Sequence, residues 1–165
     1  MAPSYVLRRA RPQDGAEFVR LVDELAAFER LDPPTASAKR RLVRDAFGRA
    51  PRFELFVASR RGRQGLVAYA IVLWTYSSFL ARPTLYLEDI YLSPDHRGTG
   101  LARSFLSYLA RVALRRKGGR IEGVVLGWNQ RARRFYRSTG AKELADWRFF
   151  RYDERALQTL AQANP

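Results

Sequence analysis

The chain has 165 residues, 47% of them hydrophobic, which suits one globular domain (residues 1–165) with a sizeable core. It has no cysteine and a single histidine, His96, which argues against a disulfide framework, a thiol nucleophile and a metal site, so we expect no metal. The net charge of +14 would attract a polyanion, either a phosphate-bearing coenzyme or a nucleic acid. No apolar run approaches the ~20 residues of a membrane span, and we find no signal peptide, so we expect no membrane partner and a cytoplasmic location.

Hydrophobic periodicity and turn residues predict alternating strands and helices along the chain. The expected elements are a strand over Tyr5–Ala10, helices over 12–29 and 35–47, strands over Phe53–Ala58, Leu66–Trp74 and Thr84–Leu92, a helix over 100–117, a strand over Ile121–Trp128, a helix over 129–139, a strand over Trp147–Tyr152 and a helix over Asp153–Ala163. This order predicts a mixed α/β fold. The crossover from Thr84–Leu92 to Ile121–Trp128 makes those two strands parallel neighbours, and the second of them is apolar enough to be buried on both faces.

The strand Thr84–Leu92 carries two adjacent acids, Glu88 and Asp89. Strict alternation would place Glu88, Ile90 and Leu92 on one face of the sheet, and Leu87, Asp89 and Tyr91 on the other. A buried carboxylate without a partner is costly, so such a residue is expected to have a partner or a task. For Glu88, the alternatives are an ion pair with a nearby arginine and a role in chemistry.

A glycine-rich segment follows this strand and opens a strongly amphipathic helix. Gly98 and Gly100 leave backbone N–H groups accessible at the positive end of the helix dipole, a typical anion site, and Arg97 adds a charge beside it. The segment lacks the Gly-Lys-Ser/Thr of a Walker loop, and Arg103 stands where a dinucleotide loop needs its third glycine. The alternative is an ordinary glycine turn into a helix.

A second motif, Trp128-Asn129-Gln130, begins the next helix, and Tyr136 lies one to two turns into it. Because neighbouring parallel strands bring their carboxyl ends to one side of a sheet, we expect this helix to converge with the anion loop. A tyrosine hydroxyl with a pKa of ~10 is protonated at neutral pH, so it could donate to a leaving thiolate. The alternative is that Tyr136 only packs in the core.

Arg97-Gly98-Thr99-Gly100-Leu101-Ala102 resembles the pyrophosphate loop of the GNAT N-acetyltransferases, which use acetyl-coenzyme A (acetyl-CoA). Four segments are similar to the diamine (spermidine/spermine-type) acetyltransferases: Tyr86-Leu87-Glu88-Asp89-Ile90, Trp128-Asn129-Gln130, Phe135-Tyr136 and Trp147-Arg148-Phe149-Phe150. The resemblance covers nearly the whole chain. It implies a mixed sheet splayed between its central strands, direct acetyl transfer to an amine without an acyl-enzyme, and a homodimer.

The resemblance also assigns roles to residues. Tyr136 would be the general acid, and Glu88 would bind the acceptor amine and take its proton. The implied acetyl-CoA contacts are Ile90, Tyr91, Leu92, Arg97, Gly98, Thr99, Gly100, Leu101, Ala102, Arg103, Asn129, Arg131, Ala132, Arg133 and Tyr136. The implied acceptor contacts are Phe28, Glu29, Glu88, Asp89 and Glu122.

The chain departs from the polyamine enzymes after Trp74-Thr75-Tyr76, where Ser77 replaces an expected acid and Phe79 an expected tryptophan. A polyamine or a lysine-like (thialysine-like) amine is therefore the expected acceptor, with a protein or antibiotic amine as an alternative. The main rival is a non-catalytic module that binds nucleic acid through the basic face, since eleven basic residues and one acid lie between Arg97 and Arg137. The chain has no recognisable nucleic-acid-binding motif, so nucleic acid is not the expected partner. A third reading is a sensor that binds acetyl-CoA without turnover.

Overall fold

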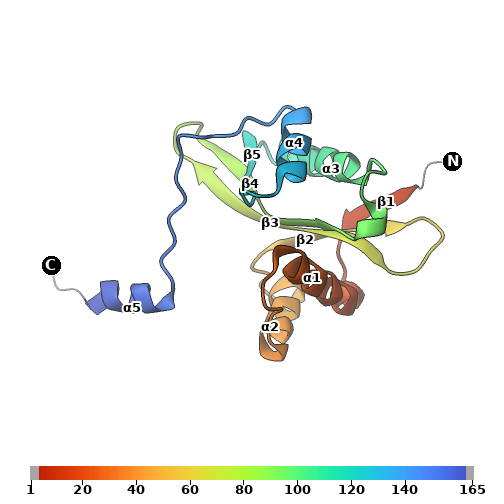
Figure 1. Cartoon of the computed structure of the whole chain (residues 1–165), viewed down its shortest axis with the longest axis horizontal. Helices are drawn as coiled ribbons and strands as arrows, with labels where there is room; N and C mark the ends of the chain where they lie inside the picture. The colour runs from red at the N-terminus through yellow and green to blue at the C-terminus, as the bar shows by residue number, and fades with distance from the viewer. Residues whose placement is uncertain (1–3, 163–165) are drawn as a thin grey trace. The chain divides into compact units, whose positions relative to one another are not determined.

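The core of the fold is a five-stranded sheet with strand order β1-β2-β3-β4-β5, seen in a computed structural model that describes residues 4–162 (Figure 1). The strands are β1 (Tyr5–Arg9), β2 (Glu54–Arg60), β3 (Leu66–Ser77), β4 (Arg82–Leu92) and β5 (Arg120–Gly123). β1 to β4 pair antiparallel in sequence order, and β5 pairs parallel to β4. The mixed α/β sheet and the parallel crossover are as predicted from the sequence.

Helices cover the two faces of this sheet, α3 on one and α1 with α2 on the other (Figure 1). The helices of the chain are η1 (Pro12–Asp14), α1 (Gly15–Glu29), α2 (Ala36–Phe47), η2 (Pro94–His96), α3 (Leu101–Arg115), α4 (Gln130–Ser138) and α5 (Glu154–Gln162). Thr35 caps α2, accepting a hydrogen bond from the Ala38 amide at 3.2 Å, as its position in the sequence predicts. Ala163, the expected last residue of α5, lies outside the described residues. No helix among residues 4–162 has the length and apolarity needed to cross a membrane.

The chain separates into two compact units, residues 1–124 and 125–165, which are described one at a time. Unit 1 contains the whole sheet with α1, α2 and α3. Its larger side chains fill two clusters, one on each face: Phe105 and Leu109 of α3 pack on one face, while Phe18 and Leu21 of α1 pack on the other. All four of these side chains are fully buried, so both helices are held by their apolar stripes.

Strict alternation along β4 is a wrong prediction, because the strand contains a β-bulge at Glu88. Ile71 pairs with Asp89 and its neighbour Val72 pairs with Leu87, which leaves Glu88 without a cross-strand partner. Leu87 therefore packs on the α3 side together with Ile90, instead of on the opposite face. One extra residue shifts the alternation by one position, which sequence periodicity cannot reveal.

The prediction of a long strand over Ile121–Trp128, buried on both faces, is also wrong. The ladder to β4 ends at the pair Leu87–Gly123, directly before the bulge, and Leu126 and Trp128 are 40% and 54% exposed. A strand needs a partner for its backbone groups, and the bulge ends that pairing. The parallel pairing of β4 and β5 thus covers four residues of each strand.

Unit 2 contains α4 and α5, joined by residues 139–153, which form no strand or helix (Figure 1). The prediction of a strand over Trp147–Tyr152 is therefore wrong for the single chain. The segment has the aromatic composition of a strand, but no strand of the described residues pairs with it, and Trp147 and Phe150 are 77% and 82% exposed.

Candidate active site

The loop between β4 and α3 presents backbone N–H groups to open space. Gly98 and Gly100 both have positive φ, 81° and 86°, the left-handed conformation that glycine adopts at little cost. Gly100 is the N-cap of the fifteen-residue α3 and has no side chain to cap it. A Cβ atom built on Gly100 would meet no heavy atom within 4 Å, so a ligand can approach this backbone. These features fit a diphosphate at the helix N-terminus.

The strand before this loop has a free edge on the side of β5. Among residues 4–162, Asp89 to Leu92 pair with β3 only, because the ladder to β5 stops at Leu87. Ile90 and Leu92 pack toward α3, and Tyr91 is buried on the α1 side. The unpaired main-chain groups of this edge can hydrogen-bond an extended ligand that carries amides. The coenzyme contacts implied for Ile90, Tyr91 and Leu92 are consistent with this geometry and stay predictions.

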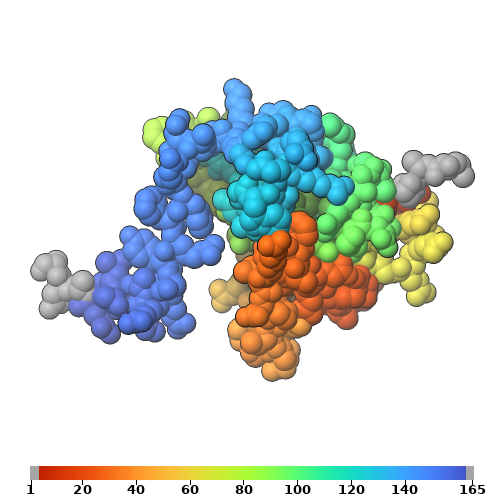
Figure 2. Space-filling model, viewed as in Figure 1, coloured from red at the N-terminus to blue at the C-terminus, as the bar shows by residue number. Residues whose placement is uncertain are grey.

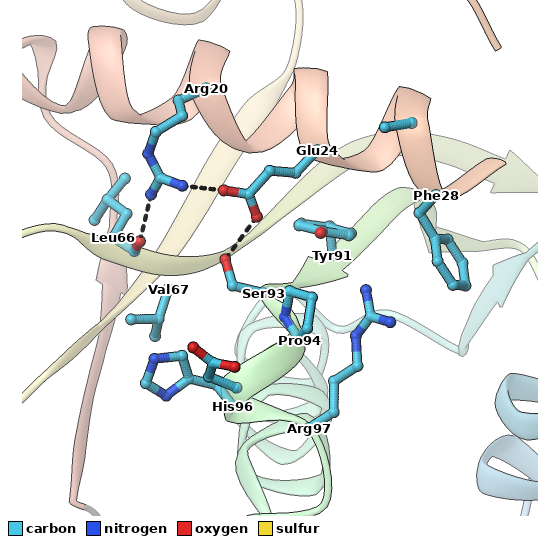
Figure 3. A pocket seen from close by; sticks show the side chains of 12 residues that line it. Arg20, Glu24, Phe28, Leu66, Val67, Tyr91, Ser93, Pro94, His96 and Arg97 are labelled. Atoms are coloured by element: carbon cyan, nitrogen blue, oxygen red, sulfur yellow. Dashed lines mark hydrogen bonds and ion pairs between the residues drawn. The ribbon is translucent and has the colours of Figure 1, made fainter. Parts of the chain in front are cut away.

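Arg97 connects the loop to the end of α1. Its guanidinium carbon lies 4.7 Å from the centroid of the Phe28 ring and 5.4 Å from that of Tyr91, and its Nε donates to the Leu92 carbonyl at 3.0 Å (Figure 3). Stacking on two aromatic faces stabilises the cation. Arg97 therefore positions Phe28, a predicted acceptor contact, beside the loop that precedes α3, and the loop motif does not reveal this contact.

A pocket of about 680 Å³ lies between α1 and the end of β4, and Arg97 forms part of its wall (Figure 3). Across it, Arg20 donates to the Leu66 carbonyl at 2.8 Å and to Glu24, and the Ser93 hydroxyl donates to Glu24 at 2.8 Å. In the space-filling view, α1 (red to orange) and the segment after β4 (green) lie beside each other (Figure 2). Glu24 and Ser93 lie 69 residues apart and meet only in the folded chain, so no sequence pattern indicates their contact.

Three carboxylates gather where α1 ends beside the bulge of β4. Burial, together with the charges of Glu88 and Glu29, raises the pKa of Asp89 to about 6, and the Tyr69 hydroxyl, which donates to Asp89 at 3.4 Å, opposes this rise. Burial also raises the pKa of Glu29, and burial with the charge of Asp89 raises the pKa of Tyr69. Glu88 itself is exposed. Tyr69 is a further site residue that the sequence did not indicate, because only the sheet register brings it to Asp89.

Basic side chains do not neutralise this cluster. Among residues 4–162, no ion pair joins Glu29, Glu88 or Asp89 to an arginine or lysine, although the chain carries 30 basic residues. The alternative of a structural ion pair at Glu88 therefore finds no partner. Glu122, in contrast, is paired with Arg120 at 2.9 Å on β5. The three carboxylates can bind a cationic ligand without first breaking an ion pair of their own.

The predicted site residues of unit 2 lie on or beside α4. Asn129 caps the helix as predicted, accepting from the Ala132 amide at 3.0 Å. Arg133 donates to the Gly127 carbonyl at 3.1 Å and pairs with Glu143 at 2.6 Å, and Arg131 is exposed. Burial raises the pKa of the half-buried Tyr136, so its hydroxyl carries a proton at neutral pH. Tyr136 thus has the protonation state that a general acid requires.

Comparison with known proteins defines the class. The profile of the Acetyltransferase (GNAT) family matches residues 18–141. A solved integron cassette protein from Vibrio cholerae is 18% identical, superposes with a TM-score of 0.81 and covers 99% of each chain, which shows the same fold. The chain belongs to the GNAT family and is an acetyl-CoA-dependent N-acetyltransferase.

Within the family, the chain is similar to enzymes that act on small amines. It is 32% identical to the thialysine N-epsilon-acetyltransferase of Bos taurus, over 94% of this chain and 96% of that protein. It is 31% identical to the L-ornithine N5-acetyltransferase of Arabidopsis thaliana, over 69% of this chain and 50% of that protein. The diamine-acetyltransferase-like character expected from the sequence is therefore confirmed.

Proposed function

We propose that this enzyme acetylates the terminal amine of a small lysine-like or diamine molecule. The observation that carries the proposal is the cluster of Glu29, Glu88 and Asp89, three carboxylates without basic partners among residues 4–162 of a chain whose net charge is +14. Such a site attracts an alkylammonium group and disfavours an anionic acceptor.

A bound ammonium group and the carboxylate cluster stabilise each other's charged forms. An ammonium group beside Asp89 stabilises the charged carboxylate and lowers its pKa from about 6, which offsets the cost of burying the acid. Phe28, held by Arg97, would cover the alkyl part of the acceptor. The cluster therefore selects a cation on an apolar stem.

The bound ammonium must then lose a proton. An amine with a pKa of ~10.4 lies three units above pH 7.4, so deprotonation in water costs about 4 kcal/mol. Glu88, which is exposed and lies in the bulge, would accept this proton, directly or through water. Bulges redirect side chains at active sites, which explains why this acid interrupts the strand.

The donor side uses the coenzyme loop and the free edge of β4. The amides of residues 98–103 would hold the diphosphate, the edge at residues 90–92 would pair with the pantetheine amides, and residues 129–133 would line the coenzyme. Acetyl-CoA supplies the acetyl group when bound. Tyr136, which carries a proton at neutral pH, would give that proton to the sulfur as the carbon–sulfur bond of the thioester breaks.

The hairpin between β3 and β4 supports a lysine-like acceptor over a polyamine. Ser77 stands where the polyamine enzymes are expected to carry an acid. It is buried, and its hydroxyl accepts from the Leu80 amide at 3.2 Å, so it closes the turn and offers no charge for a second ammonium group. Thialysine and ornithine, the compounds that name the two relatives, each carry one side-chain amine, and their α-ammonium group lies beside their own carboxylate.

A panel of acceptors tests the proposal. We expect acetyl-CoA turnover with thialysine, lysine and ornithine to exceed that with spermidine. Glu88→Gln should lower kcat/KM for amines, and the loss should shrink as the pH approaches the amine's own pKa. Asp32→Asn, which removes an exposed carboxylate after α1, is the matched control. A loss that is equal at every pH would restrict Glu88 to positioning, and turnover with spermidine alone would refute the lysine-like assignment.

We also propose that the enzyme is a homodimer whose subunits associate through the segment after α4. Large apolar side chains of this segment are exposed in the single chain, more than a monomer's surface usually carries: Leu144, Trp147, Phe149, Phe150, Tyr152, Leu157 and Leu160. Light scattering should give twice the chain mass. Trp147→Ala with Phe150→Ala should give monomers, and a monomeric wild-type enzyme would refute this proposal.

A further inference from the structure

The hydroxyl group of Tyr5, on the first strand, reaches the coenzyme loop. It lies 3.0 Å from His96 Nδ1 and donates to Thr99 Oγ1 at 3.1 Å, and the Thr99 hydroxyl donates to the His96 carbonyl at 2.9 Å. The Tyr5 and His96 rings also meet edge to face, 5.7 Å apart. More than 90 residues separate Tyr5 from this loop in the sequence.

The number of hydroxyl protons determines which group donates in each of these hydrogen bonds. Thr99 has one hydroxyl proton, which goes to the His96 carbonyl, and Tyr5 has one, which goes to Thr99. His96 Nδ1 must therefore carry a proton and donate it to the Tyr5 oxygen. Each of the three side chains then donates one hydrogen bond within the group.

The loop needs such an anchor because of its glycines. Thr99 lies between Gly98 and Gly100, which both adopt positive φ. Glycine has the largest conformational freedom in a flexible loop, so the amides that would face the diphosphate are not fixed by their own residues. Thr99 supplies the one side chain between the two glycines, and both of its hydrogen bonds lead back to Tyr5 or His96.

We propose that Tyr5 is a positioning residue for coenzyme binding. Through Thr99 it orders the amides of residues 98–100 before the diphosphate arrives, which lowers the entropic cost of binding. It contacts no reacting atom. The inference rests on the assignment of this loop to the diphosphate, and it predicts a defect only for ligands that carry that group.

Tyr5→Phe tests the inference, because it keeps the ring and removes both hydrogen bonds. Calorimetry should show a three- to tenfold weaker affinity for coenzyme A, about the size of one neutral hydrogen bond. Binding of pantetheine, which lacks the diphosphate, should be unchanged. KM for acetyl-CoA should rise by the same factor with kcat unchanged. Tyr108→Phe, which removes a hydroxyl at the edge of the same apolar cluster, is the matched control and should change none of these values.

The single histidine gives a second readout. In protein prepared without a histidine tag, nitrogen NMR should find the proton of neutral His96 on Nδ1 in the wild type and not in Tyr5→Phe. Thr99→Val should weaken coenzyme A binding similarly, and the double variant should lose no more than either single one.

Two outcomes would overturn the inference: unchanged coenzyme A affinity in Tyr5→Phe, or an equal loss for pantetheine, which would mean a general effect on folding. Gly100→Val separates this failure from that of the loop assignment. If Gly100→Val binds coenzyme A normally, the loop itself is wrongly assigned. If it does not bind while Tyr5→Phe binds normally, only the role of Tyr5 is refuted.

Discussion

Replacing Asp89 with asparagine should stabilise the free enzyme above pH 6. The carboxyl has a pKa of 3.8 when unfolded and about 6 when folded, so folding favours its neutral form. Two pKa units correspond to about 3 kcal/mol of unfolding free energy. Asparagine is always neutral and its carbonyl can still accept from Tyr69, so the variant avoids this cost.

The sign of the pH dependence follows from proton binding. Between about pH 4 and pH 6 the folded wild type holds a proton that the unfolded chain has lost. The free energy of unfolding of the wild type therefore falls, relative to that of Asp89→Asn, as the pH rises through this range. Below about pH 4 the difference vanishes, and above pH 6 it is constant. For a chain of this size, each kcal/mol shifts the melting temperature by about 2–4 °C.

Urea unfolding of both proteins from about pH 4 to pH 8 measures this difference. Asp32→Asn, which removes an exposed carboxylate after α1, is the control. The same Asp89→Asn variant should bind the acceptor amine more weakly, as a stability gain at a functional site would entail. A difference that does not change with pH, or a variant that is less stable throughout, would refute the account of Asp89.

Three further predictions concern the donor side and the charge. Tyr136→Phe should lower kcat by ~10²–10⁴ and change acetyl-CoA binding little, and turnover within threefold of wild type would make Tyr136 a packing residue. Gly100→Val should abolish coenzyme A binding by calorimetry while the domain still folds, because its side chain enters open space and its positive φ costs about 1–3 kcal/mol; retained affinity would exclude the loop. Duplex DNA should bind weakly, with steep salt dependence and no sequence preference, whereas tight selective binding at ~150 mM salt would favour a nucleic-acid partner.

Local sequence signals were sufficient for the class of fold and for the loop. Gly98 and Gly100 before an amphipathic helix, and Asn129 before α4, predict helix starts that the structure confirms. These signals are reliable because capping and glycine conformation depend on residues within one turn of each other.

Only the tertiary structure decided how the acids and the strand ends are arranged. The bulge at Glu88 depends on the register with β3, and it moves Leu87 to the other face and ends the pairing with β5. The pKa of Asp89 depends on its burial and on Glu29 and Tyr69, and the hydroxyl of Tyr5 donates to Thr99 in the loop; these contacts join residues that are distant in the sequence. Propensity and periodicity do not reveal a bulge or a contact between distant residues, because both depend on pairing and packing across the whole chain.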